Sequence, residues 1–195
     1  MRLIELKGYR QDPLYQIVSL DSVNSIEDLE DELAKHGYQR LVVGAGAHAL
    51  VFARENDPYV VKLFMKDLAY NYFMNLVRRN PGNPHFPKFK GKTISFKAGS
   101  SKWNLLRMER LRKYNRSNPE DFKIFTVFKR FMGMRPMISF DESIEQVEER
   151  VNQQFPEFKA TCQLVVDNRY QNSLDIHSGN LMFRGKTPVI IDPYI

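Results

Sequence analysis

The feature that most constrains the fold lies near the C-terminal end, where three oxygen-bearing side chains flank two short apolar runs. Asp175 and Asn180 stand on a polar stretch that leads directly into the run at 181–183. A turn containing glycine separates this run from a second one at 189–191, and Asp192 follows the second run. Two such runs around a glycine turn predict a β-hairpin. The hairpin would bring an acid, an amide and a second acid into one region.

These three side chains form a donor set suited to a magnesium–nucleotide complex. Mg²⁺ prefers hard oxygen ligands and keeps several waters, so a carboxylate, an amide oxygen and nucleotide phosphates suit it. Asn180 and Asp192 are therefore the candidate metal ligands. Asp175 is the candidate catalytic residue, because a carboxylate in this place can orient or deprotonate an accepting hydroxyl group. The alternative for the Asp175–Asn180 pair is a turn with capping side chains.

A glycine-rich stretch between two predicted strands supplies a second set of candidate residues. Gly44 and Gly46 have no Cβ, so their backbone N–H groups can approach phosphates closely. Ala49 takes the place of a third glycine, and Val51 follows it. A dinucleotide-binding turn is the competing interpretation. That turn runs from a strand into a helix, whereas this loop is predicted to run from a strand into a strand.

Lys62 lies inside the apolar run at 59–64, where a charged side chain needs an explanation. An ammonium group beneath a glycine-rich loop can hold the α- and β-phosphates of ATP. The alternative is an edge-strand lysine whose stem packs on the sheet while its head reaches water. The glycines upstream favour phosphate binding.

The character of the predicted elements changes halfway along the chain. One or two short strands are predicted within 1–20, and further strands at 41–43, 50–53, 59–64, 92–97 and 103–108. Helices are predicted at 25–36, 65–79, 118–133, 143–155 and 156–171. A sheet followed by helices and one hairpin predicts an α+β protein with two lobes, 1–112 and 113–195.

Composition excludes several classes of protein. A single cysteine, Cys162, excludes an internal disulfide framework and a cysteine-rich zinc site. No apolar run approaches the roughly 18 residues of a transmembrane helix, and the first residues lack the apolar core of a secretory signal. We therefore expect a cytoplasmic protein that has no membrane partner.

Charge is unevenly distributed along the chain. The net charge is +6, but residues 78–135 hold sixteen Lys or Arg and three acids. This basic stretch indicates a surface for phosphates or an acidic protein, or else a solvated face. Nucleic-acid binding is not expected, because no recognised nucleic-acid motif accompanies the charge.

In chain order, the glycine loop, the strand lysine, the Asp-x₄-Asn loop and the later aspartate resemble the protein-kinase-like superfamily. The segments L-D-I-H-S-G-N-L-M-F and V-I-I-D-P are most similar to the early serine/threonine protein kinases of T-seven-like bacteriophages. This resemblance implies a truncated bilobal kinase-like fold that binds ATP and Mg²⁺. Asp175 would be the catalytic aspartate, Lys62 the phosphate-binding lysine, and Asn180 and Asp192 the Mg²⁺ ligands.

The resemblance also implies nucleotide contacts and partners. The segment L-R-M-E-R-L resembles the strand and hinge that contact adenine through backbone groups, which implies Glu109 and Leu111 as nucleotide-binding residues. The substrates would be proteins in the cytoplasm of a bacterial host, and their phosphorylation would alter host transcription or defence.

Several residues depart from the family pattern. Ser173 stands where most protein kinases have a histidine. His177 makes the loop similar to the D-[IL]-H-x-G-N loop of small-molecule and atypical kinases, and we expect it to fix the loop by hydrogen bonding. The predicted helix at 65–79 holds no glutamate to pair with Lys62, and its nearest acid is Asp67. The sequence stops soon after the hairpin, so we expect no activation segment.

These departures leave two alternatives open. One is a catalytically weak or inactive kinase-fold module that binds and inhibits a host protein through the basic stretch. The other is a small-molecule kinase.

Overall fold

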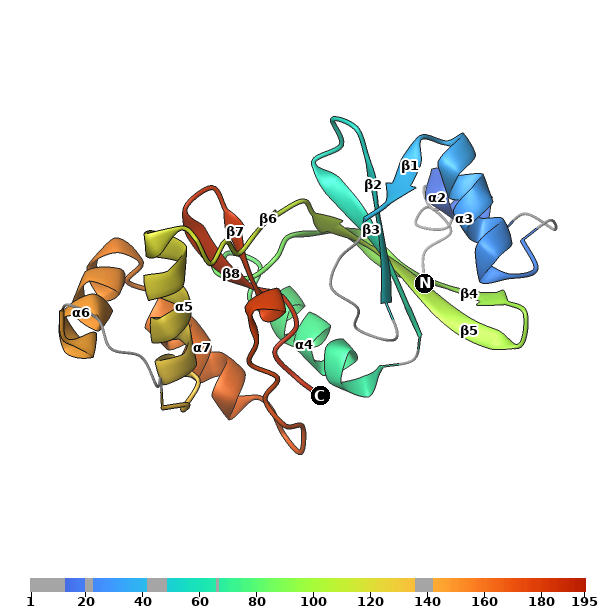
Figure 1. Ribbon diagram of the computed structural model, residues 1–195. Coiled ribbons are helices and arrows are strands. Elements are labelled where there is room, and N and C mark those ends of the chain that lie inside the picture. The colour runs from blue at the N-terminus through green and yellow to red at the C-terminus, as the bar shows by residue number, and fades with distance from the viewer. Residues whose placement is uncertain (1–12, 20–22, 42–48, 66, 136–141) are drawn as a thin grey trace. The chain divides into compact units, whose positions relative to one another are not determined.

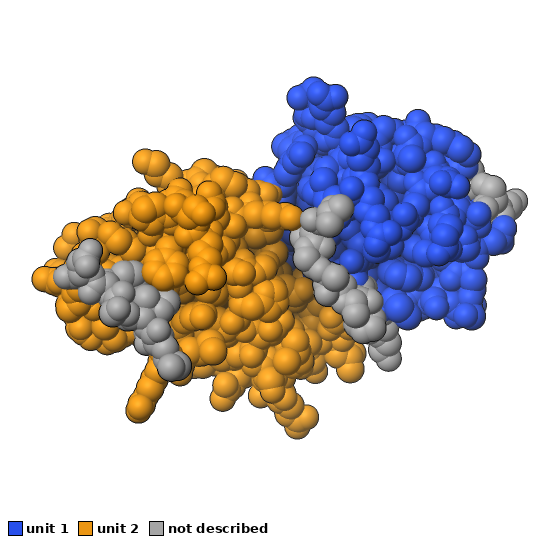
Figure 2. All heavy atoms as spheres, viewed as in Figure 1, with its two compact units in different colours: residues 1–66, 89–110 blue, residues 67–88, 111–195 orange. Residues whose placement is uncertain are grey.

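The structure, a computed structural model, describes residues 13–19, 23–41, 49–65, 67–135 and 142–195. These residues form an α+β protein, as expected, with a five-stranded sheet, a three-stranded sheet and six α-helices. The chain divides into two compact units, which Figure 2 distinguishes by colour. Unit 1 comprises residues 1–66 and 89–110, and unit 2 comprises residues 67–88 and 111–195.

Unit 1 is built on the five-stranded sheet, in which every neighbouring pair of strands is antiparallel. In spatial order the strands are β1 (Tyr38–Arg40), β2 (Ala49–Arg54), β3 (Tyr59–Met65), β5 (Ser101–Glu109) and β4 (Phe89–Ala98). All but β1 were predicted from the sequence. The strand predicted at 41–43 is not confirmed, because Leu41 lies outside any strand and the other two residues are outside the described residues.

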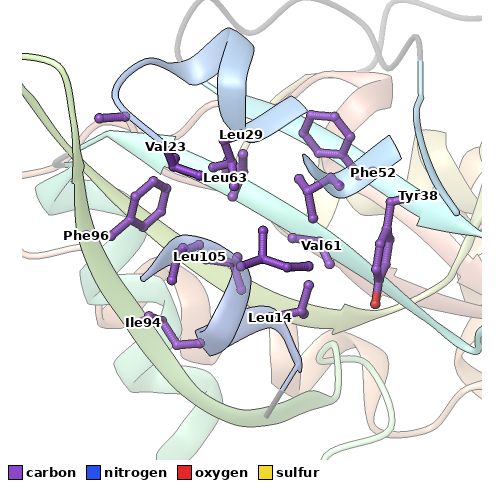
Figure 3. Close-up of a cluster of buried hydrophobic side chains, with 14 residues drawn as sticks. Leu14, Val23, Leu29, Tyr38, Phe52, Val61, Leu63, Ile94, Phe96 and Leu105 are labelled. Carbon is purple, nitrogen blue, oxygen red and sulfur yellow. The ribbon is translucent and has the colours of Figure 1, made fainter. Parts of the chain in front are cut away.

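Two helices of unit 1, α2 (Pro13–Val18) and α3 (Ile26–Lys35), cover one face of the sheet, as Figures 1 and 3 show. The sequence places the start of α3 correctly. Ser25 Oγ accepts a hydrogen bond from the Asp28 N–H at 3.1 Å, and the Asp28 carboxylate accepts one from the Ser25 N–H at 2.9 Å. The helix ends before Gly37, whose φ of 80° a residue with a Cβ rarely adopts.

The prediction of short strands within 1–20 is wrong for residues 13–18, which form helix α2. Pro13 takes the first helical position, where a missing N–H costs nothing. Leu14 and Ile17 are three residues apart and are both 2% exposed in the core beneath the sheet. Burial of one helical side therefore stabilises a helix here in place of a strand. The other residues of that prediction, apart from Ser19, lie outside the described residues.

Side chains alternate between the two faces of the sheet along each strand. Phe52 and Val61 belong to the core beneath α2 and α3, as Figure 3 shows. Ala53 and Val60 belong to a smaller buried cluster that is separate from this core. Because Lys62 lies two residues from Val60 on β3, its side chain shares the face of this second cluster.

Unit 2 contains most of the helices and the three-stranded sheet β6-β7-β8. Its elements are α4 (Leu68–Arg79), β6 (Arg112–Lys113), α5 (Pro119–Phe131), α6 (Ile144–Gln154), α7 (Phe158–Asp167), the 3₁₀ turn η1 (Ser178–Asn180), β7 (Leu181–Arg184) and β8 (Thr187–Ile190). Each predicted helix of the second half and the predicted hairpin are confirmed. Within the described residues, no helix has both the length and the apolar character needed to cross a membrane.

The segment after α4 anchors the β7–β8 hairpin. His85 is 2% exposed, and its Nδ1–H donates to the Pro188 carbonyl at 2.8 Å. The His85 carbonyl accepts from the Ile190 N–H at 2.9 Å. Arg184 donates to the carbonyls of both neighbours of His85, at 2.7 and 3.0 Å. Burial lowers the pKa of His85, although the Pro188 carbonyl opposes this effect, so the ring is neutral.

A buried carboxylate joins β6 to the start of α5. The Asp121 side chain is 4% exposed, and it accepts two hydrogen bonds from Arg112, at 2.6 and 2.8 Å. It also accepts the Asn115 N–H at 2.9 Å. Burial opposes ionisation of Asp121, but these donors outweigh it and hold the pKa of the carboxyl below its ordinary value. The Arg112 guanidinium also lies 4.5 Å from the ring centre of Phe183 on β7.

Helix α4 belongs to unit 2, which differs from the expected single division after residue 112. Phe73 on α4 is fully buried, and its ring centre lies 5.9 Å from that of Phe86 and 6.1 Å from that of Tyr194. Both partners are in unit 2, so these contacts explain why residues 67–88 group with it. The later division, between residues 110 and 111, lies two residues from the expected one.

Candidate active site

The loop that holds Asp175 and Asn180 is fixed at its start by the last residues of the chain. The N–H of Ser173 donates to the Ile195 carbonyl, and the N–H of Ile195 donates to the Ser173 carbonyl, both at 3.0 Å. The Asp175 N–H donates to the Pro193 carbonyl at 2.8 Å. The backbone of Asp175 is therefore held by a short antiparallel pairing.

Asn180 holds the candidate catalytic residue Asp175 through two hydrogen bonds. Its Nδ2 donates to the Asp175 carbonyl at 2.9 Å and to Asp175 Oδ2 at 3.0 Å. These two acceptors assign the orientation of the amide, because only the NH₂ group can donate to them. The Asn180 Oδ1 consequently points away from Asp175. The residue is 5% exposed, so this arrangement is part of the packed structure.

The turn between these two residues is η1, and His177 caps it. Nδ1 of His177 accepts the Gly179 N–H at 2.9 Å, and the His177 carbonyl accepts the Asn180 N–H at 3.0 Å. Gly179 is required by space, because a Cβ there would lie 2.7 Å from Cε1 of the His177 ring. The expectation that His177 fixes the loop by hydrogen bonding is confirmed.

Asp192 follows the second strand of the β7–β8 hairpin, and backbone pairing brings this segment next to the loop that precedes the first strand. The register pairs Leu181 with Ile190, and the Ile191 N–H donates to the Asn180 carbonyl at 3.1 Å, which extends this pairing by one step. Asp192 is the following residue. Asn180 and Asp192 therefore come from adjacent segments of one hairpin.

This donor set fits Mg²⁺ as a partly hydrated ion. Asn180 Oδ1 and the Asp192 carboxylate are hard oxygen donors, and Mg²⁺ is commonly held by one or two such groups plus phosphates and waters. Within the described residues, no three His, Cys, Asp or Glu side chains are grouped so that they could hold a metal by themselves. A Mg²⁺ ion at Asn180 and Asp192 would draw its other ligands from a bound nucleotide and water.

Tyr194 ties this site to helix α7. Its side chain is buried, and its hydroxyl donates to the Val165 carbonyl at 2.7 Å. Burial raises the pKa of the Tyr194 hydroxyl, so it stays protonated and serves as a donor. The segment 193–195, which holds the Asp175 backbone, is thereby fixed to the core of unit 2.

In unit 1, the structure brings three of the predicted nucleotide-binding residues together. Lys62 on β3 pairs directly with Val51 on β2, and Ala49 pairs with Phe64 two residues further along β3. Directly paired residues project from the same face of a sheet. Ala49, Val51 and Lys62 therefore share the face opposite α2 and α3. Leu106, on the other side of Lys62, is fully buried on this face.

The remaining predicted nucleotide-binding residues lie at edges of the described structure or outside it. Gly44 and Gly46 fall outside the described residues. Glu109 is the last residue of β5, and Leu111 begins the second part of unit 2. Asp67, the nearest acid in sequence to Lys62, caps α4 by accepting the Tyr70 N–H at 2.8 Å.

Sequence reasoning missed the residues that support the hairpin from outside the loop. His85 and Arg184 form a network of backbone contacts across about a hundred residues of sequence, which no local pattern predicts. Asp121 lies within the helix predicted at 118–133, but its buried ion pair with Arg112 was not predicted.

No protein-family model matches this chain, and a search of curated proteins found no relative.

Proposed function

We propose that this protein is an ATP-dependent phosphotransferase with a bilobal protein-kinase-like fold. The observation that carries the proposal is the Asn180 lock on Asp175, with Nδ2 at 2.9 and 3.0 Å from two Asp175 oxygens. It leaves the amide oxygen directed away from Asp175, and the backbone of Asn180 pairs with Ile191, the residue before Asp192. A carboxylate for the acceptor and two oxygens for Mg²⁺ thus come from one hairpin.

In the proposed reaction, Asp175 orients the acceptor hydroxyl toward the γ-phosphorus of ATP. A bond forms between the hydroxyl oxygen and the γ-phosphorus, the bond from that phosphorus to the β–γ bridging oxygen breaks, and ADP leaves. The hydroxyl proton passes to Asp175. Mg²⁺ at Asn180 and Asp192 would neutralise charge on the phosphates. The Asp175 side chain is 34% exposed, so a substrate hydroxyl can reach it.

Lys62, Ala49 and Val51 are proposed to bind the nucleotide, together with Gly44 and Gly46. The shared sheet face supports this assignment, because an ammonium on that face can hold phosphates while the small Ala49 leaves them room. Glu109 and Leu111 are proposed to contact adenine through their backbone groups.

The proposed substrates are serine or threonine hydroxyls of bacterial host proteins in the host cytoplasm, whose modification would alter host transcription or defence. This part rests on the similarity of the 174–183 and 189–193 segments to the early kinases of T-seven-like bacteriophages. The small-molecule alternative rests on the D-I-H-S-G-N loop.

A second candidate function is supported by the charge pattern of the β4–β5 hairpin. Lys97 pairs directly with Lys102, and both are exposed. Like charges in a direct cross-strand pair destabilise a sheet, so an acidic partner would offset the repulsion between these two lysines. In this second candidate function, a kinase-fold module binds an acidic host protein through the basic residues of the β4–β5 hairpin.

The test is incubation of the purified protein with γ-labelled ATP, Mg²⁺ and bacterial lysate. The proposal predicts labelled protein with wild type and none with Asp175→Ala or Asp192→Ala. If wild type binds Mg-ATP but labels neither itself nor a lysate protein, protein phosphorylation is refuted, and ADP release with a small-molecule panel tests the small-molecule alternative. A partner retained by Asp175→Ala but lost on Lys97→Glu/Lys102→Glu would favour the binding module.

A further inference from the structure

We infer that His177 is a positioning residue that, with Asn180, engages one oxygen of Asp175 and so leaves the other oxygen, Oδ1, for the acceptor hydroxyl. The inference rests on the proposed function and names a role for a residue outside the nucleotide and metal sites.

The first step is the tautomer of His177. Its Nδ1 accepts the Gly179 N–H at 2.9 Å, and an N–H group can only donate. Nδ1 therefore carries no proton, and in the neutral ring the proton is on Nε2. Nε2 is the ring nitrogen that lies 3.2 Å from Oδ2 of Asp175. The cap on η1 thus directs a polar N–H at the catalytic carboxylate.

The second step is that His177 and Asn180 both contact the same oxygen of Asp175, Oδ2. Asn180 Nδ2 also donates to Oδ2, at 3.0 Å. Two N–H groups at Oδ2 fix the rotation of the carboxylate about its Cβ–Cγ bond. Within the described part of the chain, both side chains that contact the Asp175 carboxylate do so at Oδ2, and no side chain donates to Oδ1. Oδ1 is therefore the oxygen left to receive the acceptor hydroxyl.

The third step is that the His177 ring packs against Gly179 and leaves no room for a Cβ there. A Cβ on residue 179 would lie 2.7 Å from Cε1 and 2.9 Å from Nδ1 of that ring. Such distances are too short for real contacts, so Gly179→Ala must displace either the ring or the turn. Gly179 is needed here for space, and its φ is not in the left-handed region.

Two substitutions separate the cap from the contact with Asp175. In His177→Asn, the amide oxygen can replace Nδ1 as the cap, since Asn is a good capping residue, but the shorter side chain no longer reaches Oδ2, which keeps only its bond from Asn180. In His177→Gln, the longer amide can place an N–H near Oδ2. We expect His177→Asn to lower kcat roughly 10- to 100-fold with unchanged KM for ATP, and His177→Gln to recover part of the loss. His36→Asn makes the same exchange at an exposed histidine in unit 1 and serves as the control.

A double-mutant cycle tests the role of Gly179. If Gly179→Ala acts by displacing the ring, it lowers kcat in the wild-type background and has little further effect in His177→Ala, so the two losses are not additive. Additive losses, or a His177→Asn variant with wild-type kcat, would overturn the inference.

A readout that does not depend on activity keeps failure of this inference distinct from failure of the proposed function. Nitrogen-15 NMR of the histidine rings in the intact protein should show the tautomer of His177 that has a bare Nδ1 and a protonated Nε2. The signal of Nε2 should shift in Asp175→Asn and stay unchanged in the control Asn172→Ala. A proton on Nδ1 would refute the geometry, whether or not the protein transfers phosphate.

Discussion

Removal of the Asp121 carboxylate is expected to destabilise unit 2 strongly. In Asp121→Ala, two hydrogen bonds from Arg112 and one from the Asn115 N–H are lost. Breaking a buried ion pair by removing one partner costs about 3–5 kcal/mol. Arg112 is 44% exposed, so water can solvate part of its guanidinium, and we reduce the expected loss to about 2–3 kcal/mol.

The assays are urea denaturation, which measures the free energy of unfolding, and thermal unfolding, both followed by circular dichroism. A loss of this size should lower the thermal midpoint by roughly 4–12 °C in a chain of this length. Glu120→Ala is the matched control, because Glu120 is the neighbouring acid on the same helix and is 64% exposed. Its effect should stay within about 0.5 kcal/mol. Equal effects of the two substitutions would refute the reasoning.

The pH dependence gives an independent check on the same pair. The folded pKa of Asp121 lies below its unfolded value, so its contribution is fully present above the unfolded pKa of about 3.9. The contribution is lost as the pH falls through the folded pKa, where the folded carboxyl also takes up a proton. The stability difference between wild type and Asp121→Asn should therefore be constant near neutral pH and shrink in acid. A difference that grows in acid would contradict this assignment.

Three further predictions follow from the site and its supports. Asn180→Ala should raise the Mg²⁺ concentration for half-maximal activity roughly tenfold or more, whereas Asn172→Ala, at a half-buried asparagine outside the candidate metal site, should not; an unchanged Mg²⁺ dependence would refute the ligand assignment. Tyr194→Phe should lose about 1 kcal/mol in urea denaturation, because the bond to the Val165 carbonyl disappears. Cys162 is fully buried and its pKa is raised by burial, so a thiol reagent should label it only as the protein unfolds; rapid labelling of the native protein would contradict this burial.

Much of the fold could be predicted because its signals are local. The capping boxes at Ser25 and Ser143 place helix starts to the residue, since the reciprocal hydrogen bonds span only three positions. The hairpin was equally predictable, because Gly185 adopts a φ of 61° in a turn between two apolar runs. The relation of Asp175 to Asn180 followed from their spacing on the loop that enters this hairpin.

The parts that sequence reasoning missed depend on contacts between distant segments. The short helix α2 resembles a strand in its residue types, and only burial against the sheet selects the helix. The strand β1 has one buried side chain, Tyr38, and exists through its pairing with β2. No local pattern marks His85 as a buried residue, because the acceptor of its ring N–H is the Pro188 carbonyl, 103 positions away in the sequence.

The pairing of residues 173–175 with 193–195 has a consequence for synthesis. The acceptors for the N–H groups of Ser173 and Asp175 are the carbonyls of Ile195 and Pro193, which leave the ribosome after the loop itself. A nascent chain that has exposed Asp175, His177 and Asn180 but not this segment cannot close the loop. The loop can therefore take up its paired structure only after residues 193–195 have left the ribosomal exit tunnel.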